Sequence, residues 1–202
     1  MRGQKRTLII GAALLATASV SPGSAQAAPV GEAPGTFRVG LNLVPEPFGQ
    51  FTFSGQILGV RATASQDTAF AFGFAPYLDY NLLPNVFLGF SPVYSVHVKP
   101  DLANADSDEQ LDLLIRAGGQ FELVPRLWLY GYLAPGYSVI MVPHADNPSG
   151  FVFGVHVGAA YDLTRTVYAN VQLGYQWGYQ SVSAGDAKDE FFQFGLGIGT
   201  RL

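Results

Sequence analysis

Apolar and polar residues alternate with a period of two along much of this chain. In segment 167–180 the odd positions are apolar or aromatic, whereas most even positions are glycine, asparagine or glutamine. Segments 151–163 and 192–202 repeat the alternation. Successive side chains of a β-strand point to opposite faces, whereas helical spacing would mix the two classes on every face. The pattern therefore predicts β-strands.

The whole pattern predicts eight strands: 37–43, 69–82, 86–98, 110–123, 127–141, 151–163, 167–180 and 192–202. The connections between them alternate in length. Short turns at 83–85, 124–126 and 164–166 alternate with longer loops at 44–68, 99–109, 142–150 and 181–190. The hairpin unit recurs about every 40 residues. A propeller blade would need about four strands per repeat, so the repeat favours consecutive two-stranded hairpins.

The N-terminus has the features of a secretory signal peptide. It carries three cations ahead of an uncharged stretch at 8–20, and it ends in the small-x-small pattern Ala25-Gln26-Ala27. We therefore expect residues 1–27 to be cleaved and residues 28–202 to form a single domain. Loss of the three cations lowers the formal net charge from −4 to −7, which argues against nucleic acid as a partner. The chain has no cysteine, which excludes disulfides and thiolate metal sites.

The composition is unusual for a water-soluble domain. Charged residues make up 13% of the chain, against about 25% in typical soluble domains, and mean hydropathy is +0.21. After the signal peptide, however, no stretch is apolar enough for a membrane helix, because polar residues interrupt 166–185 and glycine and proline interrupt 127–142.

In hydrocarbon every backbone amide must be paired internally, and apart from helices only a closed β-barrel achieves this. The sequence therefore predicts an all-β fold, an eight-stranded antiparallel up-and-down transmembrane β-barrel. The alternative is a soluble β-sandwich or lipocalin-like barrel, whose water-facing side would need more charges than the chain supplies.

The cleavable signal, eight alternating strands, alternating turn lengths and C-terminal strand resemble the small outer-membrane β-barrels of Gram-negative bacteria. The nearest type is the opacity/OmpX-like and OmpA transmembrane-domain group. The resemblance covers the whole mature chain and rests on patterns rather than on a short motif. The chain departs from the family at its last residue, Leu202, where an aromatic residue is usual. The resemblance implies an outer-membrane location, with the short turns in the periplasm and four longer loops outside.

Outward-facing aromatic residues predict two girdles at the membrane surfaces. Those near the short turns are Tyr80, Phe121 and Tyr161, and those toward the loops are Tyr94, Tyr137, Phe151, Trp177 and Tyr179. The first loop, 44–68, is too apolar for a plain tether. We expect it to contain a hairpin that extends the first two strands beyond the membrane.

The inward faces predict a polar network, because an eight-stranded barrel is only wide enough for its own side chains. Its members are Arg38, Asp79, Asp112, Arg116, Glu122, His156, Asp162, Gln172, Gln193 and Arg201. Closure should place Arg38 and Arg201 side by side, facing three carboxylates across the lumen. We interpret this network as a plug that holds the barrel shut. A selectivity constriction in a narrow channel is the alternative, and inward glycines favour it by leaving space.

Evidence for enzyme chemistry is weak. Ser95 and His97 share one face of a strand, and His144 lies in a loop, but no recognised catalytic motif surrounds them. Acidic residues in the loops 99–109 and 181–190 match no EF-hand spacing and are typical of solvated loops. We expect no catalytic residues, no metal site and no cofactor.

The sequence thus predicts a non-enzymatic outer-membrane protein with a structural or surface-interaction role carried by its loops. Its expected partners are outer-membrane lipid and lipopolysaccharide, together with a loop partner that the sequence does not identify. We expect a monomer. A narrow passive channel for small solutes and a lipid-modifying enzyme using Ser95, His97 or His144 are the alternatives.

Overall fold

The computed structural model describes residues 33–57, 60–68, 70–98, 108–141, 147–182 and 185–202, and ten β-strands account for most of them. The strands are β1 Phe37–Glu46, β2 Phe48–Ile57, β3 Val60–Thr68, β4 Phe70–Leu83, β5 Val86–Val98, β6 Asp108–Val124, β7 Leu127–Met141, β8 Ser149–Asp162, β9 Val167–Val182 and β10 Gly185–Arg201. In this part of the chain no helix is long and apolar enough to cross a membrane. The predicted signal peptide at 1–27 lies outside the described residues.

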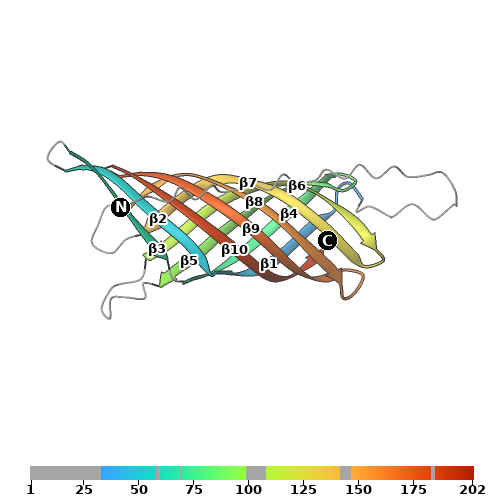
Figure 1. Ribbon diagram of the computed structural model, residues 1–202. Coiled ribbons are helices and arrows are strands. Elements are labelled where there is room, and N and C mark those ends of the chain that lie inside the picture. Colours follow the sequence, from blue (N-terminus) through green and yellow to red (C-terminus); the bar gives the residue numbers. More distant parts are fainter. Residues whose placement is uncertain (1–32, 58–59, 69, 99–107, 142–146, 183–184) are drawn as a thin grey trace, which may run out of the picture.

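Eight of the ten strands form a closed antiparallel ring. β4 to β10 pair consecutively, and β1 pairs with both β4 and β10. The closing pairs run from Arg38 opposite Arg201 to Leu43 opposite Leu196. Figure 1 shows these strands wound obliquely around one barrel. The ring confirms the predicted eight-stranded antiparallel barrel, in which closure leaves no unpaired strand edge for hydrocarbon to cover.

β2 and β3 form the hairpin that was expected within residues 44–68. They pair from Gly49 opposite Thr68 to Ile57 opposite Val60, in the register that also joins β1 to β4. β2 pairs in addition with the first half of β10. Figure 1 shows this hairpin projecting from the end of the barrel opposite the short turns, which we call the loop end.

One additional residue marks the passage from β1 to β2. Between the pairs Leu43–Leu196 and Phe48–Phe192, the β1–β2 side contains four residues and the β10 side contains three. Pro47, which has no N–H for the ladder, stands at this irregularity. Such a bulge exchanges the two faces of a strand. β2 therefore presents its even-numbered residues outward, whereas β1 presents its odd-numbered ones.

Several predicted strand boundaries are wrong. The first strand continues past residue 43 to Glu46, and β9 and β10 continue through most of the predicted loop 181–190. The acidic residues assigned to that loop therefore lie on a strand. Alternation continued backward from Gln193 reaches Asp189 on the inward face, so the signal was present in the sequence.

The short turns are tight, and two of them use left-handed backbone. Asn85 has a φ of 68° and Arg126 a φ of 74°. Asparagine tolerates this conformation, whereas it is uncommon for arginine. The carboxylate of Glu122 accepts the N–H of Arg126 at 3.0 Å, and the N–H of Asp162 donates to the Arg126 carbonyl at 2.9 Å. These two bonds hold the turn and join it to β8.

Candidate functional site

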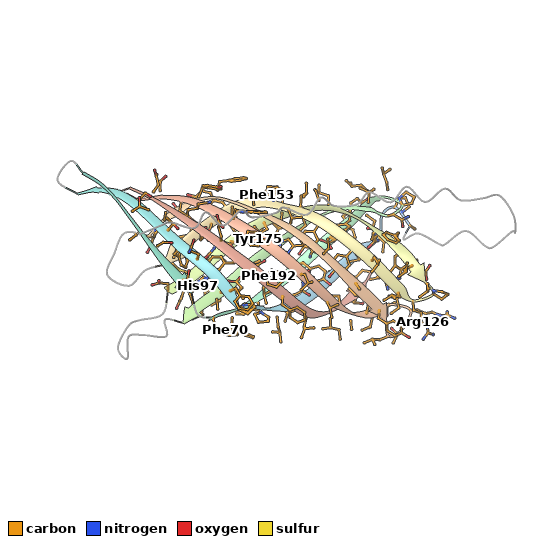
Figure 2. The ribbon with its side chains drawn as sticks, viewed as in Figure 1. Phe70, His97, Arg126, Phe153, Tyr175 and Phe192 are labelled. Atoms are coloured by element: carbon orange, nitrogen blue, oxygen red, sulfur yellow. The ribbon has the colours of Figure 1, made fainter. Side chains whose placement is uncertain are left out.

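The inward-facing side chains form the candidate site, and they are arranged in layers along the barrel axis. Figure 2 shows side chains filling the barrel and covering its outside, with Arg126 at the turn end and His97 toward the loop end. All ten residues predicted for the lumen lie on inward-facing strand positions. Seven of them are buried, and Glu122, Asp162 and Arg201 near the turns are partly exposed.

An ion-pair cluster occupies the turn end of the lumen. Nη2 of Arg38 donates to Oδ2 of Asp79 at 3.1 Å, and Nη2 of Arg116 lies 3.5 Å from the same oxygen. Arg38 also donates to Oε1 of Gln120. One buried carboxylate thus serves two buried guanidinium groups, which is how such charges are tolerated away from water.

Aromatic rings complete the surroundings of the two cations. The guanidinium carbon of Arg38 lies 4.4 Å from the centroid of the Phe87 ring. That of Arg116 lies 4.4 Å from the Tyr77 ring and 4.3 Å from the Tyr132 ring. These are attractive cation–π distances, and desolvation strengthens the attraction.

A second ion pair lies beside the first. Nη1 of Arg201 donates to Oδ1 of Asp162 at 2.7 Å, and Nε1 of Trp128 donates to the other oxygen of this carboxylate at 3.0 Å. Arg38 and Arg201 are neighbours across the closing strands, as closure requires. The expected arrangement of carboxylates across the lumen is wrong for Asp79, which is the register partner of Arg38 on the adjacent strand. Glu122 serves the backbone of the β6–β7 turn.

Tyrosine hydroxyls form the next layer. The hydroxyls of Tyr77 and Tyr168 share a hydrogen bond of 2.8 Å. The Tyr130 hydroxyl lies 3.3 Å from both the Asn170 side-chain oxygen and the Val171 carbonyl. The end of the Tyr130 side chain lies beside Gly158, where an added Cβ would come within 2.5 Å of the tyrosine Cζ and hydroxyl oxygen. Glycine at that position is therefore required by the ring.

His156 and Gln172 flank Tyr132 farther along the lumen. The Tyr132 hydroxyl donates to Oε1 of Gln172 at 3.1 Å. The imidazole of His156 stacks on the Tyr132 ring with 4.6 Å between centroids. Gly174 on β9 leaves the space that this imidazole occupies.

Apolar side chains from six strands form a layer between the two polar ends of the lumen, and the side chains of His156 and Gln172 fill the space beside the glycines of β9 and β10. The buried apolar side chains of this layer are Val44, Ala75, Val93, Leu114, Ala134 and Val152. On β6 the inward residue Leu114 lies between Arg116 on the turn side and Asp112 on the loop side. The interpretation of the polar network as a plug did not include this layer, although its members have inward parity in the sequence.

Carboxylates and amides form a buried layer at the loop end. Nε2 of Gln110 donates to Oδ1 of Asp112 at 2.9 Å and to Oδ2 of Asp189 at 3.2 Å. Gln176 donates to Asp112 at 2.7 Å, and Gln180 donates to Asp189 at 2.9 Å. Within the described ranges, no three His, Asp or Glu residues gather in a way that would hold a metal ion.

Glu46 and His97 lie at the loop end of the lumen as well. Oε1 of Glu46 accepts from Gln193 at 2.8 Å, and its other carboxylate oxygen lies 3.5 Å from Nε2 of His97. The rings of Phe191 and Phe51 contact the imidazole, with centroids at 4.9 and 5.4 Å. Phe51 reaches this position because the bulge turns the odd residues of β2 inward.

The candidate enzymatic pair is enclosed by this arrangement. Ser95 and His97 are each 2% exposed and lie on the inward face of β5. His144, the third histidine considered, lies outside the described residues.

Two cavities among the described residues of the lumen are small. One, of about 20 Å³, lies among Arg38, Tyr77 and Tyr168, and another, of about 10 Å³, lies between Val93 and Tyr132. A cavity of this size holds about one water molecule.

The aromatic residues predicted for the girdles all lie at outward positions. The exposed ones are Tyr80, Phe121, Tyr137, Phe151, Tyr161 and Tyr179. Tyr94 and Trp177 are half-buried because they pack against outward neighbours. The Tyr94 ring lies 5.5 Å from Phe74, and the Trp177 ring lies 4.7 Å from Tyr175.

Sequence reasoning missed several residues of the lumen. Glu46 and Asp189 were assigned to loops, and Gln110, Gln120 and Gln180 were not singled out. The glutamines have inward parity and were detectable. Glu46 required the extent of β1, which the proline residues around it concealed.

Comparison with known proteins agrees with this architecture. The family model described as "Outer membrane protein beta-barrel domain" matches residues 10–201. The search of curated proteins found no match. Among solved structures, outer membrane protein OprG from Pseudomonas aeruginosa is similar, with a TM-score of 0.64 and 11% identity over 85% of this chain and 98% of OprG.

Two further solved structures share the fold at a TM-score of 0.50. Ail, the attachment invasion locus protein of Yersinia pestis, is 14% identical over 84% of this chain and 99% of Ail. Neisserial surface protein A is 15% identical over 82% of this chain and 98% of its own. These likenesses concern the fold, and the family match covers nearly the whole sequence. The closed barrel, its aromatic outer surface and the family match together show that this chain belongs to the outer membrane protein beta-barrel domain family.

Proposed function

We propose that the protein is a non-conducting, non-enzymatic barrel that serves the outer membrane through the surface at its loop end. The observation that carries this proposal is the filled lumen, in which cavities of about 20 and 10 Å³ lie among packed side chains. A hydrated ion needs a continuous path of water, and voids of this size do not supply one.

The apolar layer supports the same conclusion independently of cavity size. Leu114, Val93 and Val152 are each at most 5% exposed and lie between the charged ends of the lumen. A hydrophobic constriction in a pore excludes ions by remaining dry. Small movements of the surrounding polar side chains would therefore leave the barrier in place.

The β2–β3 hairpin supports a role at the loop end. Its outward positions carry polar cross-strand pairs: Gln50–Asp67 at 2.9 Å, Thr52–Ser65 at 3.1 Å and Ser54–Thr63 at 3.3 Å. A polar outward face is suited to water, not to hydrocarbon. We propose that this hairpin is exposed outside the cell, that the short turns face the periplasm after signal-directed export, and that the barrel is a monomer in contact with lipopolysaccharide.

Single-channel recording in planar bilayers tests the absence of conduction. We expect folded wild-type protein to give no discrete conductance steps. Arg38→Ala and Arg201→Ala are the comparison variants, because each removes a cation from the turn end of the lumen. Reproducible steps from the wild type that change in Arg38→Ala would refute the proposal in favour of the narrow-channel alternative.

Lipid analysis tests the absence of enzyme activity. Ser95 and His97 are buried, and the rings of Phe51 and Phe191 contact the His97 imidazole, which argues against access by a lipid substrate. We expect cells that overproduce the protein to have the same lipid profile as cells that overproduce Ser95→Ala. A modified lipid present only with the wild type would establish an enzyme.

A further inference from the structure

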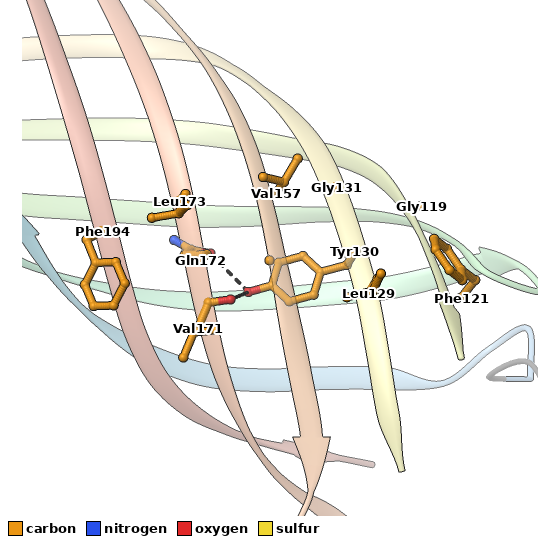
Figure 3. A pocket seen from close by; sticks show the side chains of 11 residues that line it. Gly119, Phe121, Leu129, Tyr130, Gly131, Val157, Val171, Gln172, Leu173 and Phe194 are labelled. Atoms are coloured by element: carbon orange, nitrogen blue, oxygen red, sulfur yellow. Dashed lines mark hydrogen bonds between the residues drawn. The ribbon is translucent and has the colours of Figure 1, made fainter. Parts of the chain in front are cut away.

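A large hollow lies on the outside of the barrel, on the face formed by β6 to β10. It has a volume of about 600 Å³ and is lined by residues that include Gly119, Phe121, Gly131, Leu173 and Phe194 (Figure 3). Its lining is almost entirely apolar. This volume lies within the range of about 300–1,000 Å³ that is typical of small-molecule sites.

A second hollow of about 320 Å³ adjoins the first on the turn side. Ala159, Ala169 and Leu196 line it, and Val171 lines both hollows. We call the two together the outer groove. It runs across neighbouring strands toward the short turn between β8 and β9.

The register of the strands explains why the outer surface is hollow here. Gly119 on β6 is directly opposite Gly131 on β7, so two outward positions lack side chains at one level. Ala159 is opposite Val171 one step nearer to the turns, and larger residues such as Phe121 and Phe194 form the walls. The Tyr130 ring, labelled in Figure 3, lines the hollow, and its end lies close to Gly158.

The outer groove lies in the half of the membrane nearest the short turns. Gly131 is five residues from Arg126 in the β6–β7 turn. At about 3.3 Å per residue and a strand tilt near 40°, this places it roughly 12 Å above the turn. One leaflet of hydrocarbon is about 15 Å thick. With the orientation proposed above, the groove lies in the periplasmic leaflet.

Two exposed arginines stand at the turn end of the groove. Arg126 belongs to the β6–β7 turn and Arg165 to the β8–β9 turn. The turns are neighbours, because the Asp162 N–H donates to the Arg126 carbonyl at 2.9 Å. Arginine at a membrane surface attracts anionic lipid headgroups and binds phosphate through its planar fork of donors.

We propose that the outer groove binds an anionic phospholipid of the periplasmic leaflet, with acyl chain in the hollow and phosphate between Arg126 and Arg165. The inference goes beyond the proposed function and rests only on its orientation. Lipid surrounds the outside of the barrel, but the outer groove is a recessed apolar surface that ends at two cations. Shape and charge together favour a retained lipid over one that exchanges with the bulk bilayer.

Native mass spectrometry of the full mature protein, extracted in mild detergent, tests the proposal. We expect wild-type protein to retain one phospholipid, with phosphatidylglycerol preferred over phosphatidylethanolamine. The double variant Gly119→Leu with Gly131→Leu fills the groove. An added Cβ at these positions meets its nearest neighbours at 3.4 and 3.5 Å, which is ordinary contact, so the barrel should still fold. Val39→Leu, at an exposed outward position on β1, is the matched control.

A second double variant, Arg126→Asn with Arg165→Gln, tests the headgroup contact. Asparagine suits the left-handed backbone at position 126. We expect this variant to lose about tenfold in its preference for phosphatidylglycerol, whereas Lys188→Gln at the loop end keeps it.

Each result decides the question. Equal lipid retention by the wild type and the folded groove-filling variant would overturn the proposal, as would retention of lipopolysaccharide in place of phospholipid. If the groove-filling variant fails to fold, an unchanged headgroup preference in the arginine variant would overturn it instead. Conductance of the barrel has no bearing on these outcomes, so failure here is distinct from failure of the proposed function.

Discussion

Asp79 is the residue on which the turn-end cluster depends, because its carboxylate contacts the guanidinium groups of both Arg38 and Arg116. It is 1% exposed, and both arginines are buried. Removing one partner of a buried ion pair lowers stability far more than replacing both partners by apolar residues, since the remaining charge stays buried without compensation.

Asp79→Asn should therefore destabilise the barrel strongly. We expect a loss of about 3–5 kcal/mol, because two cations lose their carboxylate partner. Urea-induced unfolding in lipid vesicles, followed by tryptophan fluorescence, measures the change. Asp186→Asn, an exposed carboxylate on β10, is the control and should change stability by less than about 0.5 kcal/mol. Equal midpoints for the two variants would contradict the central role of Asp79.

Gly158 and Gly131 provide a matched pair at neighbouring positions on opposite faces. A Cβ at Gly158 would come within 2.5 Å of the Tyr130 ring and of the Val171 carbonyl, whereas one at Gly131 meets nothing closer than 3.5 Å. We expect Gly158→Ala to cost about 1–3 kcal/mol through overpacking and Gly131→Ala to be nearly neutral. The same urea titration measures both. A neutral Gly158→Ala would show that the ring moves freely.

At the scale of elements, the bulge between β1 and β2 marks where the chain leaves the apolar band. Before it, the outward residues Leu41 and Leu43 are exposed hydrophobics, as is Phe72 on the adjacent strand. After it, beyond Phe48, the outward row becomes Gln50, Thr52 and Ser54, each hydrogen-bonded to a polar partner on β3. The outer face is therefore apolar along β1 and β4 and polar along most of the β2–β3 hairpin.

Single-cysteine labelling can test the proposed orientation, because the natural chain has no cysteine. Thr63→Cys lies on the exposed side of β3 and should react with a membrane-impermeant maleimide on intact cells. Arg165→Cys, in a short turn, should react only after the outer membrane is permeabilised. The opposite pattern would invert the proposed topology and move the outer groove to the other leaflet.

Alternation predicted the strands well because parity is a local property. It failed where parity changes or where proline interrupts a strand, as around Glu46 and Pro47. It also stopped early in β10, where charged residues suggested a loop although Asp189 continues the inward face of Gln193. Composition alone does not distinguish a buried carboxylate that accepts hydrogen bonds from amide side chains from a carboxylate exposed to water.

At the scale of the whole molecule, closure should make the barrel resistant to cold detergent. The eight strands are paired on both edges, so separating one pair leaves backbone N–H and C=O groups without hydrogen bonds in hydrocarbon. Because this is costly, we expect the barrel to unfold as one cooperative unit. We expect unheated protein to migrate differently from boiled protein in dodecyl sulfate electrophoresis. Identical mobility, with the protein found in the soluble fraction, would contradict the transmembrane barrel.

The layers of the lumen also belong to this scale. Ion pairs lie at the turn end, the apolar layer lies in the middle, and carboxylates held by amides lie at the loop end. Strand β6 contains this order by itself, with Arg116, Leu114, Asp112 and Gln110 in turn, and the other strands add the partners at each level. The arrangement arises because the stagger of the strands places residues from distant segments at one level.

The sequence by itself determined the fold class and which side chains face lipid or lumen, because strand alternation depends only on neighbouring residues. It also placed Arg38 beside Arg201, since closure joins the first and last strands. Only the tertiary structure decided the partners, such as Gln120 for Arg38 or Asp189 for Gln110. Those contacts depend on register and stagger, which are set by cooperative pairing around the whole ring and not by any local pattern.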